Sequence, residues 1–459
     1  MSVQEQAKQI DQSDELVDQK VLESAADTAL SIAKRLGADQ AEVRISNSLG
    51  QSINVRKQEL ESVEVHNDRS FTVNVYRNHC TGSATSADLS TTGIKSAVQA
   101  AMSIAQQTEA DQCLGLADKE LLANSKDCQK DLDQYHPWKA PIPELIDIAK
   151  SCEQASFDVD SRISNSEGAG INTYQGASVY ANSHGFMGFS TGTSHSLSSS
   201  VIAQDDSDMQ RDYWYDSNGN PTKLSDAASI GQKAGERAVR RLGAKQVKSC
   251  QVPVLFENSL ASSLIGHLIS AISGGVLYKK ASFMLDRLDQ IVFPEWLSLE
   301  EHPHLIGEYR SSFYDTEGVA TPEKRRIIDQ GRLASYVLGS FTSRKLGMKS
   351  TANAGGLRNL RVSNTGEDFD ELLKKMDTGF IVTELIGSGI NMVTGDYSRG
   401  ASGFWVENGK IQYPVQEVTV AGNLLDMFGD IIAIGQDVDT RNNTHTGSIL
   451  LEKLTLAGA

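Results

Sequence analysis

The sequence predicts an α+β protein with mostly antiparallel sheets and flanking helices. Three observations lead to this prediction. Segments that alternate apolar and polar residues, as half-buried strands do, come in groups separated by Gly, Asn-Asp or charged turns. Segments with apolar residues at helical spacing lie between these groups. The long alternation of single strands with helices that marks a parallel sheet is missing, which favours hairpin connections.

The N-terminal part is predicted to be a flexible polar lead-in over residues 1–19 and an α/β domain over 20–125. A helix is expected over about 21–36, where apolar residues recur at helical spacing. Alternating segments follow as far as about residue 77, and a second helix over about 92–107 closes the unit.

A central domain is predicted over 126–245, with the same order of elements. Helices are expected over about 143–157 and 224–242, with strands between them. The phrase RISNSLGQSIN starts at Arg44, and RISNSEGAGIN starts at Arg162. We interpret this match as an internal duplication of a helix, strand-meander, helix unit. Chance similarity between turn-rich strands is the alternative, because short matches are weak evidence of a repeat.

A larger, β-rich C-terminal domain is predicted over 246–459. Asn408-Gly409 lies between two alternating segments and supplies the positive φ values that a two-residue hairpin turn needs. Short helices are expected over about 342–346 and 368–376. A longer helix, capped by Asn258 and stopped by Gly274-Gly275, should present one buried stripe. The stripe consists of Leu260, Leu264, His267 and Ala271.

Composition and charge exclude several classes of protein. The formal charge is -16 and the pI is about 5.1, so the surface repels phosphate backbones, and direct nucleic-acid binding is not expected. The N-terminus shows no apolar leader, and no apolar run approaches the roughly 20 residues of a membrane span. We therefore expect a cytoplasmic protein without membrane contact. The five cysteines are scattered without CxxC spacing, which indicates reduced thiols.

Segments throughout the chain resemble the PmbA/TldD family, once called modulators of DNA gyrase. The longest is GDYSRGASGFWVENGKIQYPV, which begins at Gly395. The others are DKELLA from Asp118, NSHG from Asn182, SLSSSVIA from Ser196 and STANAGGLRN from Ser350. The resemblance covers nearly the whole chain.

In the zinc-peptidase branch of this family, the helix that corresponds to 258–271 carries His-Glu-x-x-x-His before a basic pair. Aligning that pair on Lys279-Lys280 places Gly266, His267 and Ala271 at the first ligand, the general base and the second ligand. Glycine and alanine side chains cannot bind a metal, and no cysteine follows Cys250 to act as the family's third ligand. The resemblance therefore implies the PmbA branch, also called TldE, which is the zinc-ligand-free partner of TldD.

Other candidate sites carry less chemistry. His302 and His304 flank a proline, which suggests an exposed turn, and no further ligand lies at diagnostic spacing. His267 is interpreted as a packed, hydrogen-bonded residue, or as the lining of a vestigial pocket. The aromatic residues after Gly395 are interpreted mainly as core, whereas Tyr397 and Arg399 are candidates to face a peptide or a partner. An exposed strand edge there would hold an extended peptide.

The resemblance implies a non-catalytic subunit of a cytoplasmic TldD/TldE metallopeptidase that acts on small, unfolded peptides. Peptide-antibiotic precursors and antitoxin-type proteins are the implied substrates. No cofactor is expected in this chain, and zinc is expected in the TldD-like partner. One alternative is an autonomous metallopeptidase with ligands from His267, His302 or His304. Another is a non-proteolytic interaction protein that modulates a topoisomerase or an RNA-binding regulator.

Overall fold

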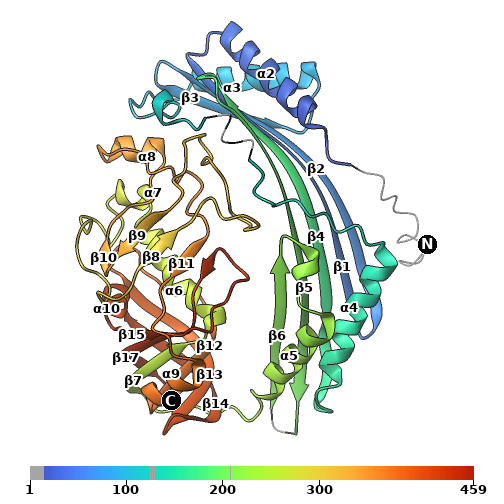
Figure 1. The fold of residues 1–459 in the computed structure, drawn as a ribbon, viewed down its shortest axis with the longest axis vertical. Coiled ribbons are helices and arrows are strands. Elements are labelled where there is room, and N and C mark those ends of the chain that lie inside the picture. Colours follow the sequence, from blue (N-terminus) through green and yellow to red (C-terminus); the bar gives the residue numbers. More distant parts are fainter. Residues whose placement is uncertain (1–14, 125, 127, 129, 207, 459) are drawn as a thin grey trace.

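The protein consists of a long, curved antiparallel sheet and a β-rich C-terminal domain that lies against one face of it (Figure 1). The structure is a computed structural model that describes residues 15–124, 126, 128, 130–206 and 208–458. Residues 1–14 of the predicted lead-in lie outside this part. The predicted α+β class with antiparallel sheets and flanking helices is confirmed.

The long sheet has six strands in the order β3-β2-β1-β4-β5-β6, and every neighbouring pair is antiparallel. Its strands are β1 (Gln40–Arg56), β2 (Glu59–Arg77), β3 (Cys80–Ser86), β4 (Ile163–Asn182), β5 (Met187–Gln204) and β6 (Met209–Asn218). Because β1 pairs with β4 in the middle, the predicted N-terminal and central domains share a single sheet.

The two halves of this sheet have the same topology, which is helix, three strands, helix. The helices are α2 (Gln19–Arg35) and α3 (Thr91–Ala105) in the first half, and α4 (Ile142–Phe157) and α5 (Ala227–Val239) in the second. Ile53 of the first matching phrase pairs with Ile171, which occupies the same position of the second phrase. The two phrases are therefore related by a local two-fold axis that passes near this pair at the centre of the sheet.

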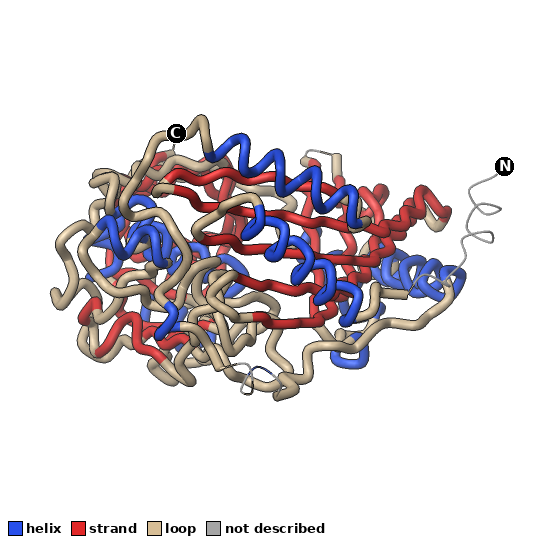
Figure 2. Tube along the Cα trace, turned by 90° about the horizontal axis from the view of Figure 1, so that it is seen from above, coloured by secondary structure: helices blue, strands red, loops and turns tan. Residues whose placement is uncertain are grey.

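The two faces of the long sheet differ in polarity. Alternate residues of β1, including Val43 and Ile53, are buried under the helices, which all cover one face. Figure 2 shows helices lying over the strands. The opposite face is polar and points toward the C-terminal domain (Figure 1). From this face Arg44 donates a hydrogen bond to the carbonyl of Thr316 at 2.6 Å, and Tyr180 donates to that of Glu317 at 3.2 Å.

The C-terminal domain contains two smaller sheets. One has the order β14-β13-β12-β7-β17-β15, and an additional β14–β17 pairing closes five of its strands into a ring. These strands are β7 (Cys250–Phe256), β12 (Gly379–Ile386), β13 (Asp396–Glu407), β14 (Lys410–Asn423), β15 (Ile431–Ile434) and β17 (Ile449–Ala457). The other sheet comprises β8 (Leu299–Glu301), β9 (Arg325–Asp329), β10 (Arg332–Leu333), β11 (Leu360–Val362) and β16 (Thr444–His445). Among the strands of the described residues, the β7–β12 and β11–β16 pairs are parallel and the other pairs are antiparallel.

Local turn and helix signals in this domain are mostly as predicted. Asn408 and Gly409 have φ values of 53° and 68°, which confirms the two-residue hairpin turn between β13 and β14. The domain's helices are α6 (Asn258–Ala271), α7 (Gly274–Leu277), α8 (Ser340–Lys345), α9 (Phe369–Met376) and α10 (Leu424–Gly429). The predicted helix ends earlier, at Ala271, and Gly274 begins the short helix α7 after a break at Ile272 and Ser273.

The predicted cap of α6 is wrong by one residue. Glu257 occupies the cap position, and Asn258 is the first helical residue. The Asn258 side chain instead donates to the carbonyl of Asp437 at 2.6 Å, so a tertiary contact uses the group that would have capped the helix. No helix within the described part of the chain is long and apolar enough to span a membrane.

Candidate functional site

Helix α6 packs one side onto the core of the C-terminal domain and leaves the other side only partly covered. Its buried face consists of Ala261, Leu264, Ile265, Leu268 and Ala271. The predicted buried stripe is therefore wrong for His267, which is half-buried at the margin of this face, and for Leu260, which is also half-buried. The apolar residues Ala261, Ile265 and Leu268 place the buried face about one residue further around the helix axis than predicted.

The two positions that the resemblance predicts for the metal ligands, Gly266 and Ala271, point in different directions. Gly266 is half-buried, and a Cβ built on it would meet no atom within 4 Å. Ala271 is completely buried in the apolar core. On a regular helix, positions five residues apart differ in direction by about 140°. Because α6 is regular from Asn258 to Ala271, these two positions do not converge on one point.

His267 lies against Tyr397 of β13 and within the electrostatic influence of Arg399 on the same strand. We call His267, Tyr397 and Arg399 the His267 cluster. The rings of His267 and Tyr397 meet edge to face, with centroids 5.9 Å apart. Tyr397 and Arg399 alternate along β13, so both side chains lie on the same face of the strand. Residues that lie about 130 positions apart in the sequence are thus neighbours in the fold.

Each member of the His267 cluster has a buried polar atom without a hydrogen-bond partner among the described residues. These atoms are Nε2 of His267, the hydroxyl of Tyr397 and Nε of Arg399. The predicted hydrogen bond of His267 is therefore not found in this part of the chain. Arg399 interacts with the Tyr397 hydroxyl and lowers its pKa, so these two polar groups offset part of the cost of each other's burial.

Burial and the charge of Arg399 set the protonation of this cluster. Burial lowers the pKa of His267, and the guanidinium of Arg399 lowers it further, so the imidazole is neutral at pH 7. Burial raises the pKa of Tyr397 to about 12, against the opposing effect of Arg399, so the phenol also stays neutral. The cluster can therefore donate or accept hydrogen bonds, with one fixed positive charge.

Zinc does not fit these residues. A hydrolytic zinc site needs about three protein ligands and an open position for water, whereas His267 is the one metal-binding side chain of the cluster. Arg399 adds a positive charge beside the imidazole, which disfavours a divalent cation. No group of three or more His, Cys, Asp or Glu residues that could hold a metal occurs in the described residues.

The second predicted metal candidate is used for packing. His302 contacts Glu300 at 3.2 Å, and His304 contacts the hydroxyl of Thr321 at 3.0 Å, so their ring nitrogens have separate partners. Pro303 between them is buried, so the predicted exposed turn is wrong. The stretch instead packs into the domain because the ring of His304 lies 4.7 Å from that of Phe313.

Strand β13 does not offer the free edge that an added peptide strand would need, since it pairs with β12 on one side and β14 on the other. Phe404 is a buried core residue, as the sequence suggests. Tyr397, a predicted candidate to face a peptide or a partner, is buried as well, whereas Arg399 is half-buried. A peptide that reaches the His267 cluster would therefore contact side chains rather than the backbone edge of this strand.

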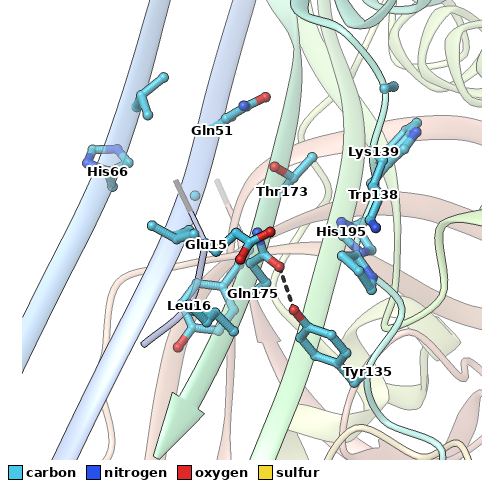
Figure 3. Close-up of a pocket in the computed structure, with 16 residues that line it drawn as sticks. Glu15, Leu16, Gln51, His66, Tyr135, Trp138, Lys139, Thr173, Gln175 and His195 are labelled. Atoms are coloured by element: carbon cyan, nitrogen blue, oxygen red, sulfur yellow. Dashed lines mark hydrogen bonds between the residues drawn. The ribbon is translucent and has the colours of Figure 1, made fainter. Parts of the chain in front are cut away.

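A cavity of about 550 Å³ lies on the helix-covered side of the long sheet (Figure 3). In it Tyr135 donates to the side chain of Gln175 at 2.8 Å, and Trp138 lies edge-on to His195 at 5.7 Å. Nε2 of His195 donates to the carbonyl of His136, which leaves its Nδ1 without a partner in the described chain. These groups include no pair of a nucleophile with its base.

A second cavity, of about 430 Å³, lies between the polar face of the long sheet and loops of the C-terminal domain. Tyr174 and Ser178 of β4 line one side, whereas Arg310 and Arg358 line the other. Sequence analysis missed these arginines because they lie on loops without a motif. The nearest signal was the family-like segment STANAGGLRN, which contains Arg358.

Comparisons with known proteins show the class to which this fold and site belong. Models of the PmbA/TldA metallopeptidases match the chain three times: domain 1 at residues 41–105, the central domain at 135–242 and the C-terminal domain at 249–458. This three-domain arrangement defines a protein of the metallopeptidase class by descent, whatever ligands its own site retains.

The relatives narrow the assignment. The Escherichia coli O157:H7 protein "Metalloprotease PmbA" is 45% identical and aligns over 96% of both chains. A homologue of it from Haemophilus influenzae is 42% identical over 95% of this chain and 96% of that one. This chain belongs to the PmbA/TldD family.

Solved structures agree in fold. A crystal structure from Bacteroides thetaiotaomicron, described as a modulator of DNA gyrase, superposes with a TM-score of 0.90 at 26% identity, covering 95% of this chain and 99% of that one. TldE from Thermococcus kodakarensis superposes with a TM-score of 0.79 at 18% identity, covering 95% and 100%, and shows the fold alone.

Proposed function

We propose that this chain is the non-catalytic, PmbA/TldE-type subunit of a cytoplasmic two-subunit metallopeptidase. A TldD-like partner holds the zinc, and the complex acts on small or unfolded peptides, such as peptide-antibiotic precursors and antitoxin-type proteins. The observation that carries this proposal is the set of residues at the family's metal positions. Gly266 and Ala271 have no donor atoms, and His267 lies beside a guanidinium.

The chemistry of hydrolysis belongs to the partner in this proposal. Bound zinc supplies a Lewis acid that polarises the scissile carbonyl and lowers the pKa of water. This chain supplies hydrogen-bonding groups and shape. Tyr397 is 1% exposed and packs inside the cluster. The half-buried imidazole of His267 offers hydrogen bonds to a peptide or to the partner, and half-buried Arg399 offers a donor with a fixed charge.

The long sheet suits a role in enclosing peptides. Its face toward the C-terminal domain carries short polar side chains, such as Ser46, Ser178 and Ser190, that line the cavity described above. Hydroxyl groups bind backbone N–H and C=O groups of any sequence. A surface of this kind favours extended, unfolded chains over folded proteins, which cannot enter a narrow space.

The proposal is tested by expressing the chain alone and together with a TldD-like partner, then counting metal in each separated subunit. We expect about one zinc per partner chain and none in this chain, with hydrolysis of an unstructured peptide by the complex only. Substituting His267 by Ala should leave the zinc content unchanged, whereas removing a zinc ligand of the partner should abolish hydrolysis.

A contrary result has a clear form. If this chain alone held one zinc and cleaved the peptide, it would be an autonomous metallopeptidase. If the complex kept its biological effect when the partner lacked its zinc ligands, this chain would be a non-proteolytic interaction protein and not a peptidase subunit.

A further inference from the structure

The cavity between the long sheet and the C-terminal domain contains two arginines that have no acidic partner. Arg358 is 8% exposed and donates one side-chain hydrogen bond, to the carbonyl of Gly356 at 3.2 Å. Arg310 is exposed and donates one, to the carbonyl of Gly355 at 3.4 Å. Within the described residues, neither guanidinium lies within 4.0 Å of a carboxylate, although each carries five N–H groups.

Other arginines of this region are neutralised. Arg361 pairs with Glu308 at 2.7 Å, and Arg325 lies 3.4 Å from buried Glu301. A buried guanidinium without an ion pair is unfavourable, because the desolvation of its charge is not compensated. Arg358 therefore retains guanidinium donors that no carboxylate of the described residues engages.

The acidic groups near the two arginines have their oxygen atoms engaged elsewhere. Asp315 accepts backbone hydrogen bonds from Glu317, Val319 and Ala354. Glu317 accepts one from the backbone of Ser340, and Glu301 accepts from Asn353 and from the backbone N–H of Arg358. Asp133 lines the cavity itself and lies 3.1 Å from His136.

These acids moderate the charge of Arg358 without occupying its donors. Burial lowers the pKa of Arg358. The negative charges of Asp315 and Glu301 raise it in part, whereas the nearby positive charge of Arg310 lowers it further. The two guanidinium groups are thus close enough to repel each other. A ligand with one negative charge between them would remove this repulsion and fill the free donor positions.

We propose that this cavity binds a carboxylate group of a peptide, held by Arg310 and Arg358. The hydroxyl groups of Ser178, Ser190 and Ser312, on both sides of the cavity, would accept and donate further hydrogen bonds to the peptide. Arg44, on the same sheet face, has no carboxylate partner in the described chain and adds positive charge nearby.

A single carboxylate fits better than a polyanion. Planar guanidinium groups bind a carboxylate through two parallel hydrogen bonds, and a fork of this kind orients an extended chain. The overall charge of -16 repels nucleic acids, whereas a peptide with one or two acidic groups is repelled little. The carboxylate can come from the C-terminus of the peptide or from an Asp or Glu side chain, and both present the same chemistry.

This inference rests on the proposed peptide-handling function, but it can fail separately, because its test involves neither zinc nor cleavage. Binding to the full-length chain is measured by fluorescence anisotropy with three short unstructured peptides, each carrying a neutral dye at its N-terminus. One has a free C-terminal carboxylate, one has an amidated C-terminus and no acidic residue, and one is amidated with a central Glu.

The variant Arg310→Gln is the principal test, since this exposed side chain can be changed without affecting the core. We expect at least one acidic peptide to bind about tenfold more tightly than the neutral one, and Arg310→Gln to remove that difference. Arg310→Lys should restore only part of it, because Lys keeps the charge but lacks the fork. Arg326→Gln, which removes an exposed arginine that pairs with Asp329, is the matched control and should change binding less than about twofold.

The relative affinities of the two acidic peptides identify the source of the carboxylate. Arg358→Gln provides a second test in the buried position, with thermal unfolding as a check that the variant folds. Equal binding of the three peptides, no binding of any of them, or unchanged binding by Arg310→Gln would overturn the proposal. None of these results would alter the zinc count of either subunit.

Discussion

Gly266 and Ala271, the two positions of α6 predicted for metal ligands, should respond in opposite ways to the same substitution. Gly266→His places an imidazole where a Cβ meets no atom within 4 Å, whereas Ala271→His places it in a completely buried core position. The two variants carry the same new side chain, five residues apart on one helix. Any difference in stability between them reports the environment of each position rather than the chemistry of histidine.

The magnitudes follow from the surroundings of each site. Replacing a helical glycine by histidine should stabilise the helix by about 0.3 kcal/mol, because glycine has the lower helix propensity. At Ala271, overpacking costs about 1–3 kcal/mol. A buried imidazole without a hydrogen-bond partner adds about 1–3 kcal/mol. We therefore expect Ala271→His to lower the free energy of unfolding by about 2–6 kcal/mol.

Urea denaturation, followed by tryptophan fluorescence, measures this difference. The triple variant Gly266→His, His267→Glu, Ala271→His rebuilds the peptidase pattern, and mass spectrometry under native conditions then counts its zinc. We expect less than stoichiometric zinc, because the regular helix keeps the two new histidines apart and the third ligand is missing. Equal stability of the two single variants, or one tightly bound zinc in the triple variant, would refute this reasoning.

Three further predictions concern charge. Arg399→Gln should raise the pKa of His267, measured by NMR of the labelled imidazole, because a neighbouring positive charge is removed. An unchanged pKa would show that Arg399 does not act on His267. The folded state holds the pKa of His267 below its unfolded value of about 6.5, so this group reduces stability as the pH falls below that value. His267→Asn should therefore weaken the decrease in unfolding free energy between about pH 7 and pH 5, and an identical pH profile would count against the assignment. Glu257→Gln should lower the unfolding free energy by about 1.5–3 kcal/mol, because Arg237 loses a 2.8 Å charged hydrogen bond and keeps its longer, 3.3 Å contact with Asp212; a loss below about 0.5 kcal/mol, about that of an exposed pair, would contradict this.

The parts of the fold that were predictable are those that depend on neighbouring residues. The turn at Asn408-Gly409 follows from the φ values that these residues tolerate, and it lies where predicted. The predicted helix over about 143–157 is α4 (Ile142–Phe157), because its periodic apolar residues meet a single face of the sheet. Exceptions arise where a distant group intervenes, as Asp437 does at Asn258.

Pairing between distant segments was not predictable in the same way. The two similar phrases indicated a repeat, but nothing local showed that Ile53 would pair with Ile171 in one shared sheet. The ring of strands depends on contacts of Thr419 to Ala421 with the final strand, β17. Register of this kind is decided by which apolar faces can be buried together, and this depends on the whole domain.

The candidate site shows the same division. The sequence alone determined that Gly266 and Ala271, the positions predicted for metal ligands, have no donor atoms, because this is a property of single residues. Tertiary structure decided that Arg399 lies beside His267 and that Arg310 and Arg358 share one cavity. The reason is physical. The donor atoms of a side chain are fixed by the identity of that residue, whereas burial, unpaired hydrogen bonds and electrostatic fields exist only once remote segments pack together.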